Sequence, residues 1–137
     1  MPSARTSRRR STNLLPTGIF TIPEVSTVGE TEESLKSKGT RICGGHGDAI
    51  ARTPEVKSSV TPTGFLKLLF NRSDMRLLGV HVIGEQASEL VHIGLMAMQS
   101  GGGAELFSRV CFNYPTLGEL YKFAAYDAML KQMGLIV

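Results

Sequence analysis

Two apolar runs near the middle of the chain flank a short polar segment. Residues 64–70 and 77–83 are rich in Leu, Val, Ile and Phe, whereas residues 71–76 read Asn-Arg-Ser-Asp-Met-Arg. Apolar, β-type runs joined by a few turn-forming residues are typical of a β-hairpin. The pattern therefore predicts two antiparallel strands joined by this turn.

Between residues 87 and 100 the apolar positions recur at the spacing of a helix. The residues that share this face are Ala87, Leu90, Val91, Gly94, Leu95 and Met98. Their spacing predicts an amphipathic helix that ends at the three glycines of residues 101–103. A shorter helical segment is expected over residues 104–109. A last helix is predicted after Pro115, with Thr116 as its N-cap and Glu119 completing a capping box.

The N-terminal part of the chain is predicted to hold shorter elements. Residues 18–22 are β-rich and stop at Pro23, which fits an edge strand that continues over residues 25–28. Thr31 opens a short helix that ends at Gly39. Residues 41–43 are expected to form a short strand. A glycine-rich loop follows it at Gly44, Gly45 and Gly47.

Strands, a helix, a hairpin and then helices thus follow one another along the chain. Strands joined by a hairpin belong to an antiparallel sheet, and helices that follow it cover one of its faces. The prediction is an α+β fold, an antiparallel β-sheet with helices packed on one face, in a single domain over residues 15–137. A chain of 137 residues is long enough to bury a substantial core.

The composition favours a globular protein, with 42% hydrophobic and 20% charged residues. No apolar run approaches the roughly 18 residues needed to cross a bilayer, so no membrane partner is expected. The first residues lack the apolar stretch of a secretory signal, which favours a cytoplasmic location. Cys43 and Cys111 form no recognisable spacing pattern, and we expect both to be reduced and buried.

The charge is unevenly distributed along the chain. Fifteen basic and 12 acidic side chains give a net charge of +3, and four arginines within residues 1–14 contribute +4, so the remainder carries −1. We expect residues 1–14 to form a basic, disordered arm. Most such arms are solvated tails and some bind nucleic acid. A stand-alone binding module for nucleic acid is therefore an alternative, and nucleic acid is the less favoured partner.

The motifs that suggest chemistry in this sequence are incomplete. Gly44-Gly45-His46-Gly47 has the glycines of a phosphate-binding loop but no full helix after it. Cys43 and His46 have the spacing of one metal-ligand pair, whereas zinc sites generally have two such pairs. No hydrolase-type arrangement of Ser, His and Asp occurs. We therefore expect no catalytic residue, no metal site and no bound cofactor in this chain alone.

The segment of residues 110–116 is apolar and aromatic and turns sharply just before a predicted helix. Tyr114 and Tyr121 are large amphipathic side chains of the kind enriched at protein interfaces. A monomer can also bury such side chains in its own core. From the residues alone, an interface and a core position are equally open for both tyrosines.

Four stretches of the chain resemble, in the same order, the C-terminal dimerisation domain of the pyridine nucleotide-disulfide oxidoreductase family. They are residues 16–29, 64–70, 78–94 and 112–119, within a span from residue 15 to about residue 129. Within the family, the segment Phe112-Asn113-Tyr114-Pro115-Thr116 is most similar to that of the soluble pyridine nucleotide transhydrogenases. The three glycines at residues 101–103 are a further likeness to them.

The resemblance implies a homodimer and a flavoprotein parent. In the related disulfide reductases a histidine before the Pro-Thr pair serves the redox disulfide of the partner subunit. That position is Tyr114 here, and a phenol is a poor proton acceptor at neutral pH. The implied parent is instead a transhydrogenase that moves hydride between NADPH and NAD through FAD. Phe112, Asn113, Tyr114 and Tyr121 would lie at the dimer interface, and Tyr114, Pro115 and Glu119 would lie near the partner's flavin.

The FAD-binding and nicotinamide-binding domains of that family have no counterpart in this sequence. We therefore expect a truncated or separately encoded dimerisation domain that is inactive alone and binds neither FAD nor NAD(P) by itself. In a complete enzyme it would associate with the domains that bind FAD and NAD(P). The same domain from another flavoprotein disulfide reductase is a further alternative.

Overall fold

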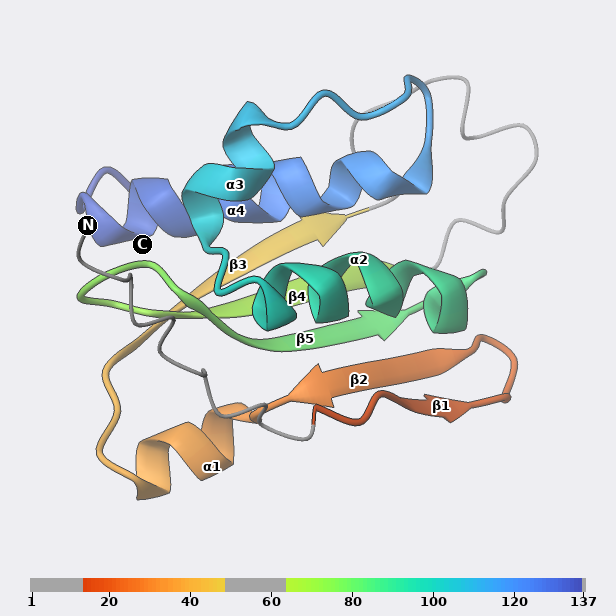
Figure 1. Ribbon diagram of the computed structural model, residues 1–137, viewed down its shortest axis with the longest axis horizontal. Helices are drawn as coiled ribbons and strands as arrows, with labels where there is room; N and C mark the ends of the chain where they lie inside the picture. The colour runs from red at the N-terminus through yellow and green to blue at the C-terminus, as the bar shows by residue number, and fades with distance from the viewer. Residues whose placement is uncertain (1–13, 49–63, 137) are drawn as a thin grey trace, which may run out of the picture.

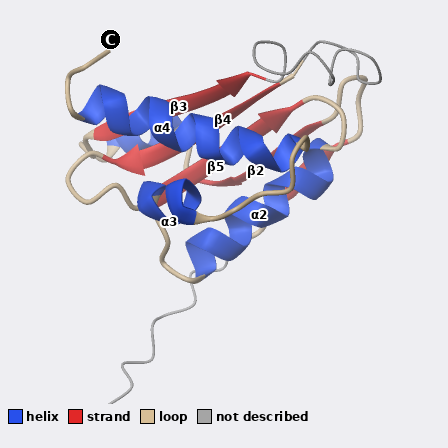
Figure 2. Cartoon of the chain, turned by 90° about the horizontal axis from the view of Figure 1, so that it is seen from above, coloured by secondary structure: helices blue, strands red, loops and turns tan. Residues whose placement is uncertain are grey.

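The computed structural model describes residues 14–48 and 64–136, which form a five-stranded antiparallel sheet with the helices of residues 87–132 on one face (Figures 1 and 2). The strands are β1 (Thr17–Ile19), β2 (Val25–Gly29), β3 (Ile42–Asp48), β4 (Phe65–Asn71) and β5 (Leu77–Ile83). The helices are α1 (Glu32–Ser37), α2 (Ala87–Gln99), α3 (Ala104–Arg109) and α4 (Leu120–Gln132), and the 3-10 turn η2 (Leu117–Glu119) leads into α4. The predicted α+β class is confirmed.

Two regions discussed from the sequence fall outside these residues. Apart from Leu14, the predicted basic arm of residues 1–14 is not among the described residues. The same holds for residues 49–63, which connect β3 to β4. Within the described residues, no helix combines the length and the apolar character required to cross a membrane.

The predicted hairpin is confirmed as β4 and β5, the central pair of the sheet order β1-β2-β5-β4-β3. Lys67 is paired with His81, and Leu68 with Val80. Because side chains alternate along a strand, one face of β4 presents only apolar residues to the helices. These residues, Leu66, Leu68 and Phe70, are completely buried.

Helix α1 begins and ends as the sequence predicts. The Thr31 hydroxyl oxygen accepts a hydrogen bond from the Ser34 amide at 3.1 Å, so Thr31 is the N-cap. Gly39 has a φ of +69°, a conformation that glycine adopts at little cost after a helix. Both signals are local, which is why the sequence alone identifies them.

The glycine-rich segment of residues 44–47 was predicted as a loop, and this prediction is wrong. The segment is part of β3 and pairs along its length with β4. A Cβ atom at Gly45 would stand 1.9 Å from the Ala124 carbonyl oxygen, and one at Gly47 would stand 2.5 Å from the Leu120 carbonyl oxygen. These two glycines therefore allow the backbone of α4 to lie directly on the strand.

The first strand also differs from the prediction. It ends at Ile19, and residues 25–28 do not continue it but return beside it as β2. Thr17 lies opposite Thr27 in this antiparallel pair, and the buried Ser26 hydroxyl donates a hydrogen bond to the Thr17 carbonyl at 3.0 Å. The break at the proline is a hairpin turn, which residue preferences alone do not distinguish from a kink in one strand.

The capping box predicted after Pro115 is not formed. The Thr116 hydroxyl donates to the Asn113 carbonyl at 2.6 Å, so it points back into the preceding loop. The turn η2 follows, and α4 begins only at Leu120. The loop thus uses the hydroxyl that a capping box would need.

Candidate functional site

The loop before Pro115 carries most of the residues that the sequence assigns to pairing. Tyr114 is 66% exposed, and the peptide bond between Tyr114 and Pro115 is cis. Phe112 is half-buried and packs against the core, beside Gly118, where a Cβ would come within 3.3 Å of the phenyl ring. The loop is therefore anchored by Phe112 and presents Tyr114 outward.

Glu119 closes the turn that follows this loop. Its amide donates a hydrogen bond to the Thr116 carbonyl at 3.2 Å. Its carboxylate is half-buried and forms no hydrogen bond or ion pair with another residue in the described part of the chain. The backbone of Glu119 thus shapes the turn, and a position of Glu119 near the partner's flavin stays a prediction.

Tyr121 occupies a different position from the one that the sequence assigns to it. Its side chain is 0% exposed, and its ring lies against Phe107 with a centroid distance of 5.1 Å. Its hydroxyl donates to the Leu90 carbonyl at 2.7 Å and accepts from the Gly94 amide at 3.1 Å. Burial raises the pKa of this phenol. Tyr121 is a core residue that joins α4 to α2, so the prediction that places it at the dimer interface is wrong.

A glycine within α2 is the sequence signal for this contact. Gly94 lies in the middle of α2, where glycine normally weakens a helix by about 1 kcal/mol relative to alanine. A Cβ there would stand 3.0 Å from the Tyr121 hydroxyl and 2.5 Å from a methyl group of Val80. A glycine inside an otherwise regular helix thus marks the point where the tyrosine reaches the helix backbone.

Other large apolar side chains are also exposed. On the hairpin of β1 and β2, Phe20 is 80% exposed. The same hairpin also exposes the side chains of Ile19 and Ile22. Helix α3 exposes Leu106, and Val110 directly after it is exposed as well. These side chains lie on separate elements, and exposed apolar residues are common on folded proteins, so they do not by themselves mark the pairing surface.

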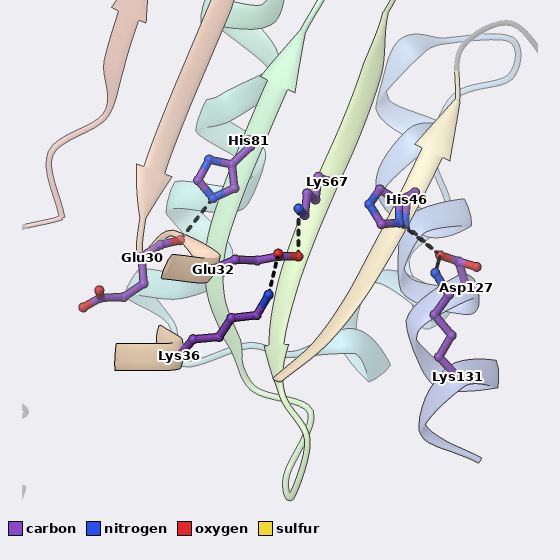
Figure 3. Close-up of polar contacts among 8 residues, drawn as sticks. All are labelled: Glu30, Glu32, Lys36, His46, Lys67, His81, Asp127 and Lys131. Carbon is purple, nitrogen blue, oxygen red and sulfur yellow. Dashed lines mark hydrogen bonds and ion pairs between the residues drawn. The ribbon is translucent and has the colours of Figure 1, made fainter. Parts of the chain in front are cut away.

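The face of the sheet away from α2 carries polar contacts instead (Figure 3). Lys67 and the α1 residue Glu32 form an ion pair at 2.8 Å, and the His81 ring nitrogen Nε2 lies 3.1 Å from the Glu30 carbonyl oxygen. Hydrogen bonding to Lys67 holds the pKa of Glu32 below its usual value, and Lys38 does the same for Glu30. This part of the sheet face is therefore polar and partly covered by α1, which does not favour it for apolar pairing.

Burial lowers the pKa of His81 below its ordinary value of 6.5 and outweighs the hydrogen bond to the Glu30 carbonyl, which raises it. The unfolded chain then binds a proton at a pH where the folded chain does not. The stability contributed by neutral His81 is complete above pH 6.5 and decreases as the pH falls towards the folded-state pKa. Glu30 and Glu32 lose their contribution only below their ordinary pKa of 4.5.

We therefore expect the free energy of unfolding to fall between about pH 7.5 and about pH 5.5, and His81→Gln to reduce that slope. Urea unfolding at both pH values measures the effect. The control is His92→Gln, because His92 is exposed on α2. An equal slope in the native protein and in His81→Gln would contradict the role of His81.

The open edge of β3 is covered by α4 (Figure 3). The His46 amide donates to the Asp127 carboxylate at 2.9 Å, and Lys131 pairs with the same carboxylate at 3.0 Å.

Cys43 and His46 are three residues apart in the strand, so their side chains point to opposite faces and do not form a metal-ligand pair. Cys43 is buried as predicted, but Cys111 is exposed.

The chain resembles known proteins over most of its length. The family model described as pyridine nucleotide-disulphide oxidoreductase, dimerisation domain, matches residues 15–125. The soluble pyridine nucleotide transhydrogenase of Ectopseudomonas mendocina is 43% identical over 119 residues, which are 84% of this chain and 25% of that protein. The transhydrogenase of Pseudomonas putida strain W619 is 40% identical over 124 residues, which are 88% of this chain and 26% of that protein. The chain thus spans about a quarter of the length of these relatives.

Solved structures share the fold. The HOCl-induced flavoprotein disulfide reductase RclA from Escherichia coli matches with a TM-score of 0.75 and 24% identity, over 82% of this chain and 26% of that chain. The NAD-dependent persulfide reductase from A. fulgidus matches with a TM-score of 0.69 and 19% identity, over 90% of this chain and 23% of that chain. At these identities the likeness is one of fold alone.

Proposed function

Because this chain belongs to the pyridine nucleotide-disulphide oxidoreductase family as a dimerisation domain, we propose that it pairs the subunits of a transhydrogenase-type flavoenzyme. The complete enzyme would move hydride between NADPH and NAD by way of FAD, in the cytoplasm. The observation that carries the choice of parent is the identity of 40–43% to soluble pyridine nucleotide transhydrogenases over more than four fifths of the chain.

Tyr114 supports the same choice. In the resembling disulfide reductases this position holds a histidine that exchanges protons with a disulfide, and a phenol does not do this readily at neutral pH. Hydride transfer between nicotinamide and flavin needs no such proton acceptor. A tyrosine here is therefore compatible with a transhydrogenase and disfavours a disulfide reductase.

The proposed contact surface consists of Phe112, Asn113 and Tyr114, and in the dimer Tyr114, Pro115 and Glu119 would lie near the partner's flavin. Tyr114 is exposed and amphipathic, and its loop is held by Phe112 and by the Thr116 hydroxyl. A rigid aromatic residue of this kind is well suited to contact both a partner subunit and the edge of a flavin. FAD would supply the acceptor for hydride, and this loop would contribute one wall of its site in the dimer.

The proposal predicts that the 137-residue chain sediments as a dimer at micromolar concentration. Tyr114→Ser should raise the dissociation constant at least about tenfold, because truncation of an aromatic interface anchor commonly costs more than about 1.4 kcal/mol. Sedimentation velocity over a concentration series measures this. The same sample, mixed with FAD, NADPH and NAD, should show no hydride transfer.

The control for Tyr114→Ser is Phe20→Ser, which removes an aromatic ring of similar exposure from the hairpin of β1 and β2. It should leave the dissociation constant unchanged. A monomer at all concentrations would contradict pairing by this chain, and weakening by Phe20→Ser alone would move the interface to the hairpin. Hydride transfer by the isolated chain would show that it holds an active centre of its own.

A further inference from the structure

One end of the sheet brings together the start of β3, the turn between β4 and β5, and the C-terminal end of α4 (Figure 1). A depression of about 370 Å³ lies there, which is within the size range of small-molecule sites. It is lined by Arg41, Arg72, Ser73, Gln132 and Met133. Two arginines thus line one open space together with a serine, a glutamine and a methionine.

Hydrogen bonds connect these three segments to one another. The Arg72 amide donates to the Arg41 carbonyl at 2.9 Å, so the turn is tied to the residue before β3. The Gln132 side chain Nε2 donates to the Arg72 carbonyl at 2.9 Å, which ties the end of α4 to the same turn. The Ser73 amide and hydroxyl both donate to the Asn71 side-chain oxygen. The backbone of the two arginines is therefore well defined.

The charges of Arg41 and Arg72 are not neutralised by the described part of the chain. Neither guanidinium lies within 4.0 Å of a described carboxylate oxygen. Among the described lysines and arginines, those that form ion pairs are Lys36, Lys38, Lys67, Arg109 and Lys131. The C-terminal end of α4 offers about half an elementary negative charge, which is less than the two positive charges present.

We propose that Arg41 and Arg72 form a binding site for the phosphate group of a small ligand. Guanidinium groups bind phosphate oxygens through pairs of parallel hydrogen bonds, and two of them match the charge of a phosphate dianion. The second N–H of the Gln132 amide would be a further donor, and Met133 would supply an apolar border for the rest of the ligand. The site lies at the C-terminal end of α4, apart from the loop before Pro115, and does not depend on the proposed pairing.

Titration of the 137-residue chain with inorganic phosphate and with pyrophosphate, at constant ionic strength set by NaCl, tests the proposal. Saturable shifts of backbone amide resonances at Arg41, Arg72 and Ser73 are expected, with half-saturation in the millimolar range for phosphate and lower for pyrophosphate. Arg41→Gln and Arg72→Gln should each weaken binding about tenfold, the loss typical of one charge-assisted contact. Both residues are exposed, so the variants keep the fold.

The matched control is Arg76→Gln. Arg76 belongs to the same turn, and its guanidinium also forms no ion pair with a described carboxylate, but it does not line the depression. It should leave the affinity unchanged. An equal loss with Arg76→Gln would indicate general attraction of anions to a basic surface and would overturn the site. Shifts that do not saturate, or that persist in the Arg41→Gln Arg72→Gln double variant, would overturn it as well.

Discussion

Replacing Gly45 with alanine is expected to destabilise the domain by about 3 kcal/mol or more, a large part of the 5–15 kcal/mol typical of such domains. The added Cβ would stand 1.9 Å from the Ala124 carbonyl oxygen and 2.9 Å from the Ala128 side chain. Both neighbours belong to the buried face of α4, so the whole helix would have to move away from β3. A carbonyl group of the helix backbone cannot move aside by itself as the end of a flexible side chain can.

Thermal and urea unfolding followed by circular dichroism measure this effect. The control is Gly44→Ala one residue earlier, because a Cβ there meets no atom closer than 3.9 Å. It should change the free energy of unfolding by less than about 1 kcal/mol. If Gly45→Ala and Gly44→Ala unfolded at the same temperature, α4 would not lie against the strand as described.

Tyr121→Phe is the second change with a large expected effect. The Tyr121 hydroxyl bridges the Leu90 carbonyl and the Gly94 amide, two groups four residues apart on α2. Without this hydroxyl, the two hydrogen bonds that it forms in a fully buried site are lost. The expected loss is about 1–3 kcal/mol, since the ring itself still fills its place against Phe107.

Urea unfolding should show a lower midpoint with an unchanged slope, because the area exposed on unfolding stays the same. Tyr126→Phe is the matched control, since this tyrosine of α4 is 43% exposed. It should alter the free energy of unfolding by no more than about 0.5 kcal/mol. An equal effect of both substitutions would mean that the buried hydroxyl contributes nothing beyond general polarity.

The sequence alone determined the elements whose signals are local. The hairpin of β4 and β5 followed from two apolar runs around a polar turn, and α2 followed from the spacing of its buried residues. The limits of α1 followed from Thr31 and Gly39, which act on backbone groups a few residues away. The family resemblance depended on ordered motifs along the chain, and the match over residues 15–125 confirms it.

Only the tertiary structure decided the positions whose partners are distant in the chain. Gly45 lies in a strand because α4, about 80 residues later, packs on it, and a glycine-rich segment by itself is equally compatible with a loop. Tyr121 and Tyr114 look alike in sequence, yet Tyr121 reaches Leu90 and Gly94 in the core while Tyr114 is held outward by its loop. The periodicity of one segment reports which side is buried but not what lies against it. The depression between Arg41 and Arg72 likewise exists only because three distant segments meet at one end of the sheet.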